Sequence, residues 1–190
     1  MDFSAEEANH LIRNRRSIYP GGYTGERVSD EVIKDMLENA NWAPTHKLTE
    51  PWRFTVFCDE GMNEFLKIHE KAHKKAGKKM DESKLKKLEG KLQKTSHVIS
   101  IGMRRDKAIP EMEEVAAVAA AVQNMQLTAT AYGVGCYWST GGITFMKEAR
   151  KFFDLKKNDL LMGFLFVGTP KKWPKGKRKS IDKKVEWVRS

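Results

Sequence analysis

The chain has 190 residues, 40% of them hydrophobic and 32% charged, which suits one globular domain (residues 1–190) and excludes a disordered chain. Lys and Arg number 35 against 25 Asp and Glu, and the net charge of +10 suits an anionic ligand, nucleic acid or a solvated lysine-rich surface. Two distant cysteines give no disulfide framework or metal motif, and without a signal peptide or membrane-length apolar run we expect a cytoplasmic protein with no membrane partner.

A first amphipathic helix is predicted at the N-terminus. A capping box begins at Ser4, and apolar residues at helical spacing continue to about Asn14. Arg15, Arg16 and Ser17 follow directly, where this helix should end. Two guanidinium forks and a hydroxyl can grip a phosphate, but an arginine pair at a helix end can also simply face water and complement the helix dipole.

The next segments are a helix, a polar loop and a strand. Ser29 can cap a second helix, which Pro44 ends, and Trp52 to Cys58 is expected to form a strand. The loop between them is bounded by two prolines and contains His46. A polar loop between a helix and a central strand is a common mount for a binding site, whereas a lone loop histidine is more often only a surface residue.

A lysine-rich segment occupies about residues 65–94. Between Lys67 and Lys94 there are eleven lysines and four acidic residues, with Gly77 and Gly90 as interruptions. We expect helical pieces in a solvated, mobile surface insertion, with a lid over a pocket as the alternative. The segment offers few aromatic side chains on which bases could stack, which argues against a nucleic-acid partner.

The clearest helix is expected from about Pro110 to Tyr132, after a buried strand from His97 to Met103. Seven alanines between Ala116 and Ala131 make this helix apolar nearly all round. Such a helix must be buried nearly all round, so we expect it either at the centre of the core or at a subunit interface.

A glycine-rich turn and a second buried strand follow this helix. The turn, residues 133–142, lacks the spacing of a dinucleotide fingerprint, but its hydroxyls and backbone amides could approach a ligand closely. A short helix is expected from Lys147 to Phe153 and a buried strand from Leu160 to Val167. The C-terminal arm, about residues 171–190, is basic and ends in alternating apolar residues, which we expect to pack against a partner surface.

Taken in order, these segments resemble the flavin-dependent nitroreductase family. The resemblance rests on four stretches, namely Arg15–Ser17, Ala43–Phe54, the alanine-rich helix with the turn after it, and Met162–Pro170. The short length and the Ala-Pro-Thr-His-Lys loop are similar to the compact bacterial subgroup of minimal nitroreductases. The resemblance implies an α+β fold with a central, mainly antiparallel β-sheet flanked by helices, in an intertwined homodimer.

The resemblance also implies an FMN-dependent NAD(P)H oxidoreductase. FMN would lie at the subunit interface and pass electrons from NAD(P)H to nitroaromatic, quinone or similar acceptors in ping-pong turnover, without a catalytic side chain or a metal. The implied cofactor-binding residues fall into phosphate, loop and turn groups: Arg15, Arg16, Ser17 and Arg178 at the phosphate, Trp42 and His46 on the flavin, often from the second subunit, and Trp138, Ser139 and Thr140 against the ring.

Two residues depart from the pattern that the resemblance implies. Many relatives have a basic residue near the flavin ring where this chain has Tyr19, and a smaller or basic residue where it has Trp42. Fewer cations near the ring would stabilise anionic reduced flavin less, and Trp42 could instead form a wall of the substrate pocket. The remaining alternatives are an FMN-binding protein with a non-reductase role and a basic polyanion-binding module.

Overall fold

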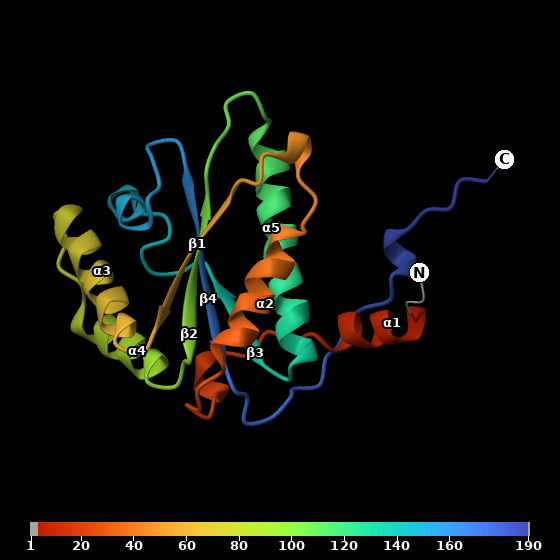
Figure 1. Ribbon diagram of the computed structural model, residues 1–190, viewed down its shortest axis with the longest axis horizontal. Coiled ribbons are helices and arrows are strands. Elements are labelled where there is room, and N and C mark those ends of the chain that lie inside the picture. Colours follow the sequence, from red (N-terminus) through yellow and green to blue (C-terminus); the bar gives the residue numbers. More distant parts are fainter. Residues whose placement is uncertain (1–3, 190) are drawn as a thin grey trace.

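The computed structural model describes residues 4–189, so Met1–Phe3 and Ser190 lie outside it. Figure 1 shows a central sheet with helices on both sides and two segments that extend away from it. The helices and strands are α1 (Ala5–Asn14), α2 (Asp30–Asn41), β1 (Trp52–Cys58), α3 (Gly61–Lys75), α4 (Glu82–Leu92), β2 (His97–Met103), α5 (Glu111–Ala131), β3 (Gly135–Ser139) and β4 (Leu160–Gly168). Short 3-10 helices are η1 (Pro20–Gly22), η2 (His46–Leu48), η3 (Lys147–Phe153) and η4 (Asp182–Lys184).

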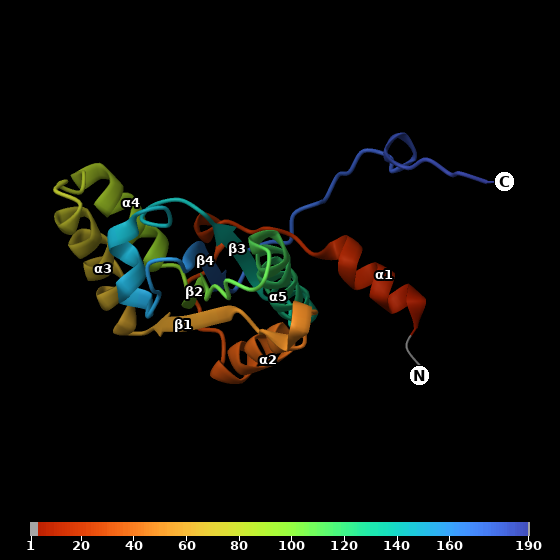
Figure 2. The same ribbon diagram turned by 90° about the horizontal axis from the view of Figure 1, so that it is seen from above.

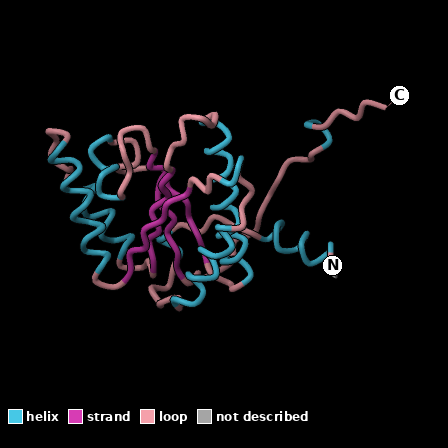
Figure 3. The backbone as a smooth tube through the Cα atoms, turned by 45° about the horizontal axis from the view of Figure 1, so that its top comes forward, coloured by secondary structure: helices cyan, strands magenta, loops and turns pink. Residues whose placement is uncertain are grey.

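The four strands form one sheet in the order β1-β2-β4-β3, and each neighbouring pair is antiparallel. The tube in Figure 3 shows this sheet between helical layers. The α+β class with a central antiparallel sheet is therefore confirmed, as are the predicted strands from Trp52 to Cys58 and from His97 to Met103. Ser17 adds an isolated parallel bridge to Cys136 at the outer edge of β3.

The alternation of side chains along β2 and β4 divides the core into two parts. Successive side chains of a strand point to opposite faces of the sheet. Ile99 and Leu165 thus join the cluster under α2 and α5, whereas Val98 and Phe166 join the cluster under α3 and η3. Phe164 lies on the second face as well, and so the side of the sheet that α3 covers carries an aromatic surface.

The lysine-rich segment is more ordered than the sequence indicated. Phe65, Ile68 and Ala72 recur at helical spacing and are buried, because α3 packs against the sheet. The expectation of a mobile, solvated segment is thus wrong for α3, since the count of lysines obscured this apolar stripe. Gly77 does separate the two helices, with a left-handed φ of 68°, but Gly90 lies inside α4 and does not interrupt it.

The long helix α5 is covered on one side only. Its buried residues, among them Val118, Val122 and Met125, face the sheet and α2 (Figure 2). Ala116 and Gln123 are exposed, and Ala119 and Ala120 are half-buried. Burial nearly all round, as the composition predicted, is therefore not achieved within one chain, and the remaining face is free in the chain as described.

Two segments extend from the body of the molecule. α1 and the C-terminal arm run out on the same side, past the end of α5 (Figures 1 and 2). Ser4 caps α1 by accepting a hydrogen bond from the Glu7 amide at 3.3 Å, as predicted, but α1 buries none of its own residues. Trp173 of the arm donates its indole N–H to the Asn14 carbonyl at 2.8 Å, which ties the arm to the end of α1. Within residues 4–189, no helix combines the length and the apolar character needed to cross a bilayer.

Candidate functional site

A basic pocket lies between the end of α1 and the C-terminal arm. Its volume is about 280 Å³, and it is lined by Ile12, Arg13, Arg15, Arg16, Gly176, Lys177 and Arg178. Arg15, Arg16 and Arg178 come from opposite ends of the chain, and the fold brings all three to this pocket as the sequence suggested. The described residues that line it include no carboxylate, and a cluster of guanidinium groups without a counter-charge suits a phosphate.

Backbone carbonyls and one amide side chain hold the two helix-end arginines in place. Arg15 donates to the Gln126 side chain of α5 at 2.8 Å. Arg16 donates to the carbonyls of Arg13 and Arg15, at 2.7 and 2.8 Å, and to that of Pro174 at 3.1 Å. A Cβ at Gly176 would collide with the Arg16 guanidinium, so the arm passes this arginine at a distance that only glycine permits.

Charge repulsion within the basic pocket affects Arg15. Partial burial, and then the nearby guanidinium groups of Arg178 and Arg16, lower the pKa of Arg15 from its ordinary value. Both causes disfavour the positive charge in the absence of a partner. An anion in the pocket would remove the repulsion, which is the electrostatic signature of an anion-binding site.

The edge strand β3 leads from the basic pocket to the glycine-rich turn. Ser17 is exposed beside the start of β3, where the Ile18 amide donates to the Cys136 carbonyl at 2.8 Å. Cys136 itself is buried, as expected for a packed small residue. The three residue steps from Cys136 to Ser139 span about 10 Å of strand. The candidate phosphate donors and the turn thus lie one short strand apart.

The end of β3 and the turn after it carry the predicted ring-contacting residues. Trp138 is half-buried and donates its indole N–H to the Met162 carbonyl at 3.0 Å, which fixes the orientation of its ring. Ser139 is half-buried, and Thr140 is exposed. Gly142 adopts a left-handed φ of 66°, and this backbone conformation brings the turn close to the His69 ring.

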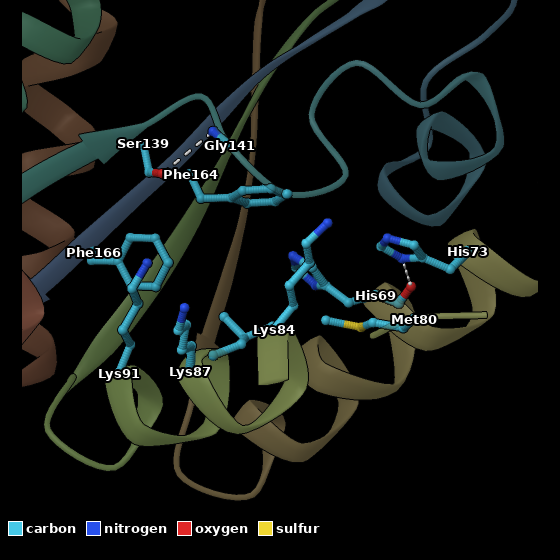
Figure 4. Close-up of a pocket in the computed structure, with 12 residues that line it drawn as sticks. His69, His73, Met80, Lys84, Lys87, Lys91, Ser139, Gly141, Phe164 and Phe166 are labelled. Carbon is cyan, nitrogen blue, oxygen red and sulfur yellow. Dashed lines mark hydrogen bonds between the residues drawn. The ribbon is translucent and has the colours of Figure 1, made fainter. Parts of the chain in front are cut away.

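A second cavity, here called the turn cavity, opens beside this turn (Figure 4). Its volume is about 320 Å³, a size suited to a small-molecule ligand. It is lined from α3 and the loop after it by His69, His73 and Met80, from α4 by Lys84, Lys87, Leu88 and Lys91, and from the sheet and turn by Ser139, Gly141, Gly142, Phe164 and Phe166. The lysines and histidines of this cavity were not predicted as site residues, because only the fold brings α4 next to the turn.

His69 forms the buried wall of the turn cavity. Its side chain is held between Phe65 and Phe164, and its Nδ1 lies 3.0 Å from the Phe65 carbonyl. A hydrogen on Nδ1 satisfies that carbonyl and leaves Nε2 as an acceptor near Gly142. Burial lowers the pKa of His69 to about 4, so this imidazole is neutral at pH 7.

The loop residue His46 lies far from the basic pocket of the same chain. The His46 Nδ1 is 3.1 Å from the Glu113 carboxylate at the start of α5, whereas Arg15 binds Gln126 near the other end. Thirteen residues of α-helix correspond to about 20 Å. Trp42 is 79% exposed and donates to Glu38 at 3.0 Å. Within one chain, the structure therefore does not bring His46 to the phosphate group, whereas Trp42 lies about one turn beyond Asn39, which hydrogen-bonds to Asn124 and Thr128 of α5.

The comparisons with known proteins identify the family. The family model described as "Nitroreductase family" matches residues 12–169. The chain belongs to the nitroreductase family. Among curated relatives, it is 32% identical over 172 residues to YfhC of Bacillus subtilis, a protein named as a candidate NAD(P)H nitroreductase, with 90% of this chain and 88% of that one covered. This confirms the expectation of an NAD(P)H-dependent flavin oxidoreductase.

Solved structures support the same assignment. A nitroreductase-like family protein from Bacillus cereus is 28% identical, with a TM-score of 0.83 and all of both chains covered. A nitroreductase-like protein from Desulfovibrio desulfuricans, solved in complex with FMN, has a TM-score of 0.75 at 24% identity, with 98% and 99% of the two chains covered, and so shows the same fold. Among the residues that the structure describes, no cluster of three or more His, Cys, Asp or Glu side chains could hold a metal ion.

Proposed function

We propose that this protein is an FMN-dependent NAD(P)H oxidoreductase that reduces nitroaromatic, quinone or similar electron-poor acceptors in ping-pong turnover. The observation that carries the proposal is the convergence of Arg15, Arg16 and Arg178 on one pocket without a counter-charge, a strand's length from a turn rich in backbone amides. The relatives named above add the NAD(P)H nitroreductase activity and the FMN complex.

The residues of the chain fit FMN at both of its ends. In the proposed arrangement, the phosphate binds in the basic pocket, with Ser17 as a further donor, and the ring lies against Trp138, Ser139 and Thr140 beside the turn cavity. Once bound, FMN supplies the hydride chemistry, taking a hydride from NAD(P)H and passing two electrons to an acceptor. The protein binds the cofactor, orients it and leaves one side of the ring accessible to each substrate in turn.

The α4 lysines offer a source of positive charge near the flavin ring, which Tyr19 does not provide. Tyr19 is 63% exposed and stacks against Tyr137 of β3, with ring centroids 4.2 Å apart, and supplies no cation. Lys84, Lys87 and Lys91 instead place ammonium groups around the cavity next to the turn. In the proposed complex these charges favour the anionic reduced form of the flavin.

A homodimer completes the proposed site. In the proposed dimer, Trp42 and His46 would contact the flavin of the second subunit, and His46 lies about 20 Å along α5 from the phosphate pocket of its own chain. The surfaces left uncovered in one chain fit such a partner. Met112 and Phe145 are each 82% exposed, Trp187 is 77% exposed, and α1 buries no residue. In the proposed homodimer, the second subunit would cover part of this exposed apolar surface.

Three measurements on the purified protein test the proposal. A visible absorbance spectrum should show bound flavin, and sedimentation velocity should give a dimer. Anaerobic mixing with NADH or NADPH should bleach the flavin, and a nitroaromatic or quinone added afterwards should restore the colour, as ping-pong turnover requires. A colourless protein that takes up no added FMN would refute the proposal. Bound FMN without reduction by either nicotinamide would favour the non-reductase alternative.

A further inference from the structure

One face of α4 is a stripe of lysines directed at the turn cavity. Lys84, Lys87 and Lys91 stand at positions i, i+3 and i+7, which share one side of a helix. All three line the cavity, and in Figure 4 their side chains rise from α4 toward Phe164 and Phe166 on the sheet. The stripe thus lines the cavity, although all three lysines also remain exposed to water.

The described residues that line this cavity include no carboxylate to balance the lysines. Two acidic residues at this helix, Asp81 and Glu89, make other contacts. Asp81 caps α4, accepting from the amides of Ser83 and Lys84 at 2.8 and 3.2 Å, and Glu89 lines a different cavity. Three ammonium groups around one cavity repel each other and attract an anion, and partial exclusion of water strengthens both effects.

The opposite wall of the turn cavity is apolar and aromatic. Phe164 and Phe166 extend from β4, while Leu88 of α4 and Met80 in the loop before it add aliphatic and thioether surface elsewhere in the lining. An aromatic ring can pack against such a wall while a charged substituent reaches the lysines. Lysine is a flexible point charge, so the stripe can attract an anionic group without fixing one geometry for it.

We propose that the turn cavity selects acceptors that are aromatic and anionic, with a carboxylate directed to Lys84 and Lys87. This inference rests on the proposed function and names the substrate class of the same site. The reaction is unchanged: one NAD(P)H and one proton convert a nitro group into a nitroso group and water, with FMN as the carrier. Neutral nitroaromatics remain substrates but lose the attraction of the stripe.

A matched pair of acceptors tests the charge preference. Initial rates with 4-nitrobenzoate and 4-nitrobenzamide, which differ in charge and little in shape, give two values of kcat/KM for each variant. We expect Lys84→Gln and Lys87→Gln each to lower the ratio of kcat/KM for the benzoate to that for the benzamide roughly fivefold to tenfold, because any effect on the flavin is common to both acceptors and cancels in the ratio. Lys86→Gln is the control, because Lys86 is exposed on the other side of the same helix and should change neither value.

Binding of a compound that cannot be reduced gives a second readout. Calorimetric titration of the FMN-loaded protein with benzoate and benzamide should give tighter binding of benzoate, and added salt should weaken only that binding. Equal affinities, or equal losses in the Lys86→Gln control, would overturn the inference. A yellow protein that reduces both acceptors without a charge preference would overturn it while leaving the proposed function intact. A colourless protein that takes up no FMN would instead refute the proposed function.

Discussion

Two cationic regions lie near opposite ends of β3, and they are built in different ways. In the basic pocket, Arg15 and Arg16 are half-buried and fixed by hydrogen bonds to carbonyls and to Gln126. In the turn cavity, Lys84 and Lys87 stand on an exposed helix, with long stems that can move. The first region has rigid forks in set positions, and the second has mobile point charges.

This difference fits the two kinds of ligand that the proposed function requires. A cofactor that stays bound gains from donors that are already ordered, since little conformational entropy is lost when it binds. Substrates that bind and dissociate in alternation need electrostatic attraction to the site without tight binding in one fixed geometry. The comparison therefore predicts that changes in the basic pocket alter FMN retention, whereas changes in the turn cavity alter substrate choice.

The largest effect is expected in the basic pocket. Arg15→Ala combined with Arg16→Ala removes two charged donor groups, each of which contributes about 1.5–3 kcal/mol to a phosphate contact. We expect the dissociation constant of FMN to rise at least about 100-fold. Fluorescence titration of the apoprotein with FMN measures this constant. Circular dichroism and sedimentation check that the variant keeps the fold and the assembly state of the unmodified protein.

Arg104→Ala is the matched control for the double variant. Arg104 pairs with Asp154 at 2.9 Å on a 94% exposed carboxylate and does not line the basic pocket. It should leave FMN affinity unchanged. Unaltered affinity in the double variant would show that the phosphate binds elsewhere, and the contrast between the two cationic regions would then fail.

The sequence predicted the basic pocket better than the turn cavity, for a physical reason. Arg15, Arg16 and Ser17 are adjacent in the chain, at the end of a helix with a clear cap. The arginine pair alone could equally have faced water, and the resemblance to the family singled out these residues as phosphate ligands. The turn cavity depends on the packing of α3, α4 and β4, which no local pattern encodes. Alternation along β4 predicts that neighbouring side chains point to opposite faces of the sheet. It does not predict which face α3 covers, so the sequence alone could not place Phe164 beside α3.

The fold was predictable wherever burial leaves a strong periodic signal. The strands from Trp52 and His97 and the helix after Pro110 were all predicted close to their observed bounds. The burial of α3 was missed, because lysines on its water-facing side dominate the composition. His69 was given no chemical role for the same reason, although it is only 4% exposed and forms a wall of the turn cavity.

A smaller effect, in the turn cavity, comes from pH. Because the pKa of His69 is about 4 in the folded protein and near its ordinary 6.5 in the unfolded chain, only the unfolded chain gains this proton between these values. The contribution of neutral His69 to the free energy of unfolding is therefore fully present above about pH 6.5. It is lost as the pH falls toward 4, which lowers the free energy of unfolding by about 3 kcal/mol. Urea denaturation from pH 4 to 7.5 should show a shallower pH dependence for His69→Gln than for the unmodified protein.

The control for this pH effect is His10→Gln, because His10 is exposed on α1. It should keep the pH dependence of the unmodified protein. If His69→Gln and His10→Gln gave the same slope, the buried wall of the turn cavity would not be the neutral imidazole described above. The positive charge of that cavity could then no longer be assigned to the lysines alone.

The smallest effect tests whether the rigidity of the basic pocket matters in itself. Gly176→Ala adds one methyl group, which would collide with the Arg16 guanidinium at the far end of a flexible side chain. The fold should therefore survive while the guanidinium shifts from its place beside the Pro174 carbonyl. Losing one well-placed charged contact costs about 1.4 kcal/mol, so FMN affinity should fall about tenfold with an unchanged melting temperature of the apoprotein.

Gly21→Ala is the control, because a Cβ there meets no atom within 4 Å. An unchanged FMN affinity in Gly176→Ala would mean that the arginines hold phosphate as mobile charges, just as the lysines of the turn cavity are proposed to attract a carboxylate.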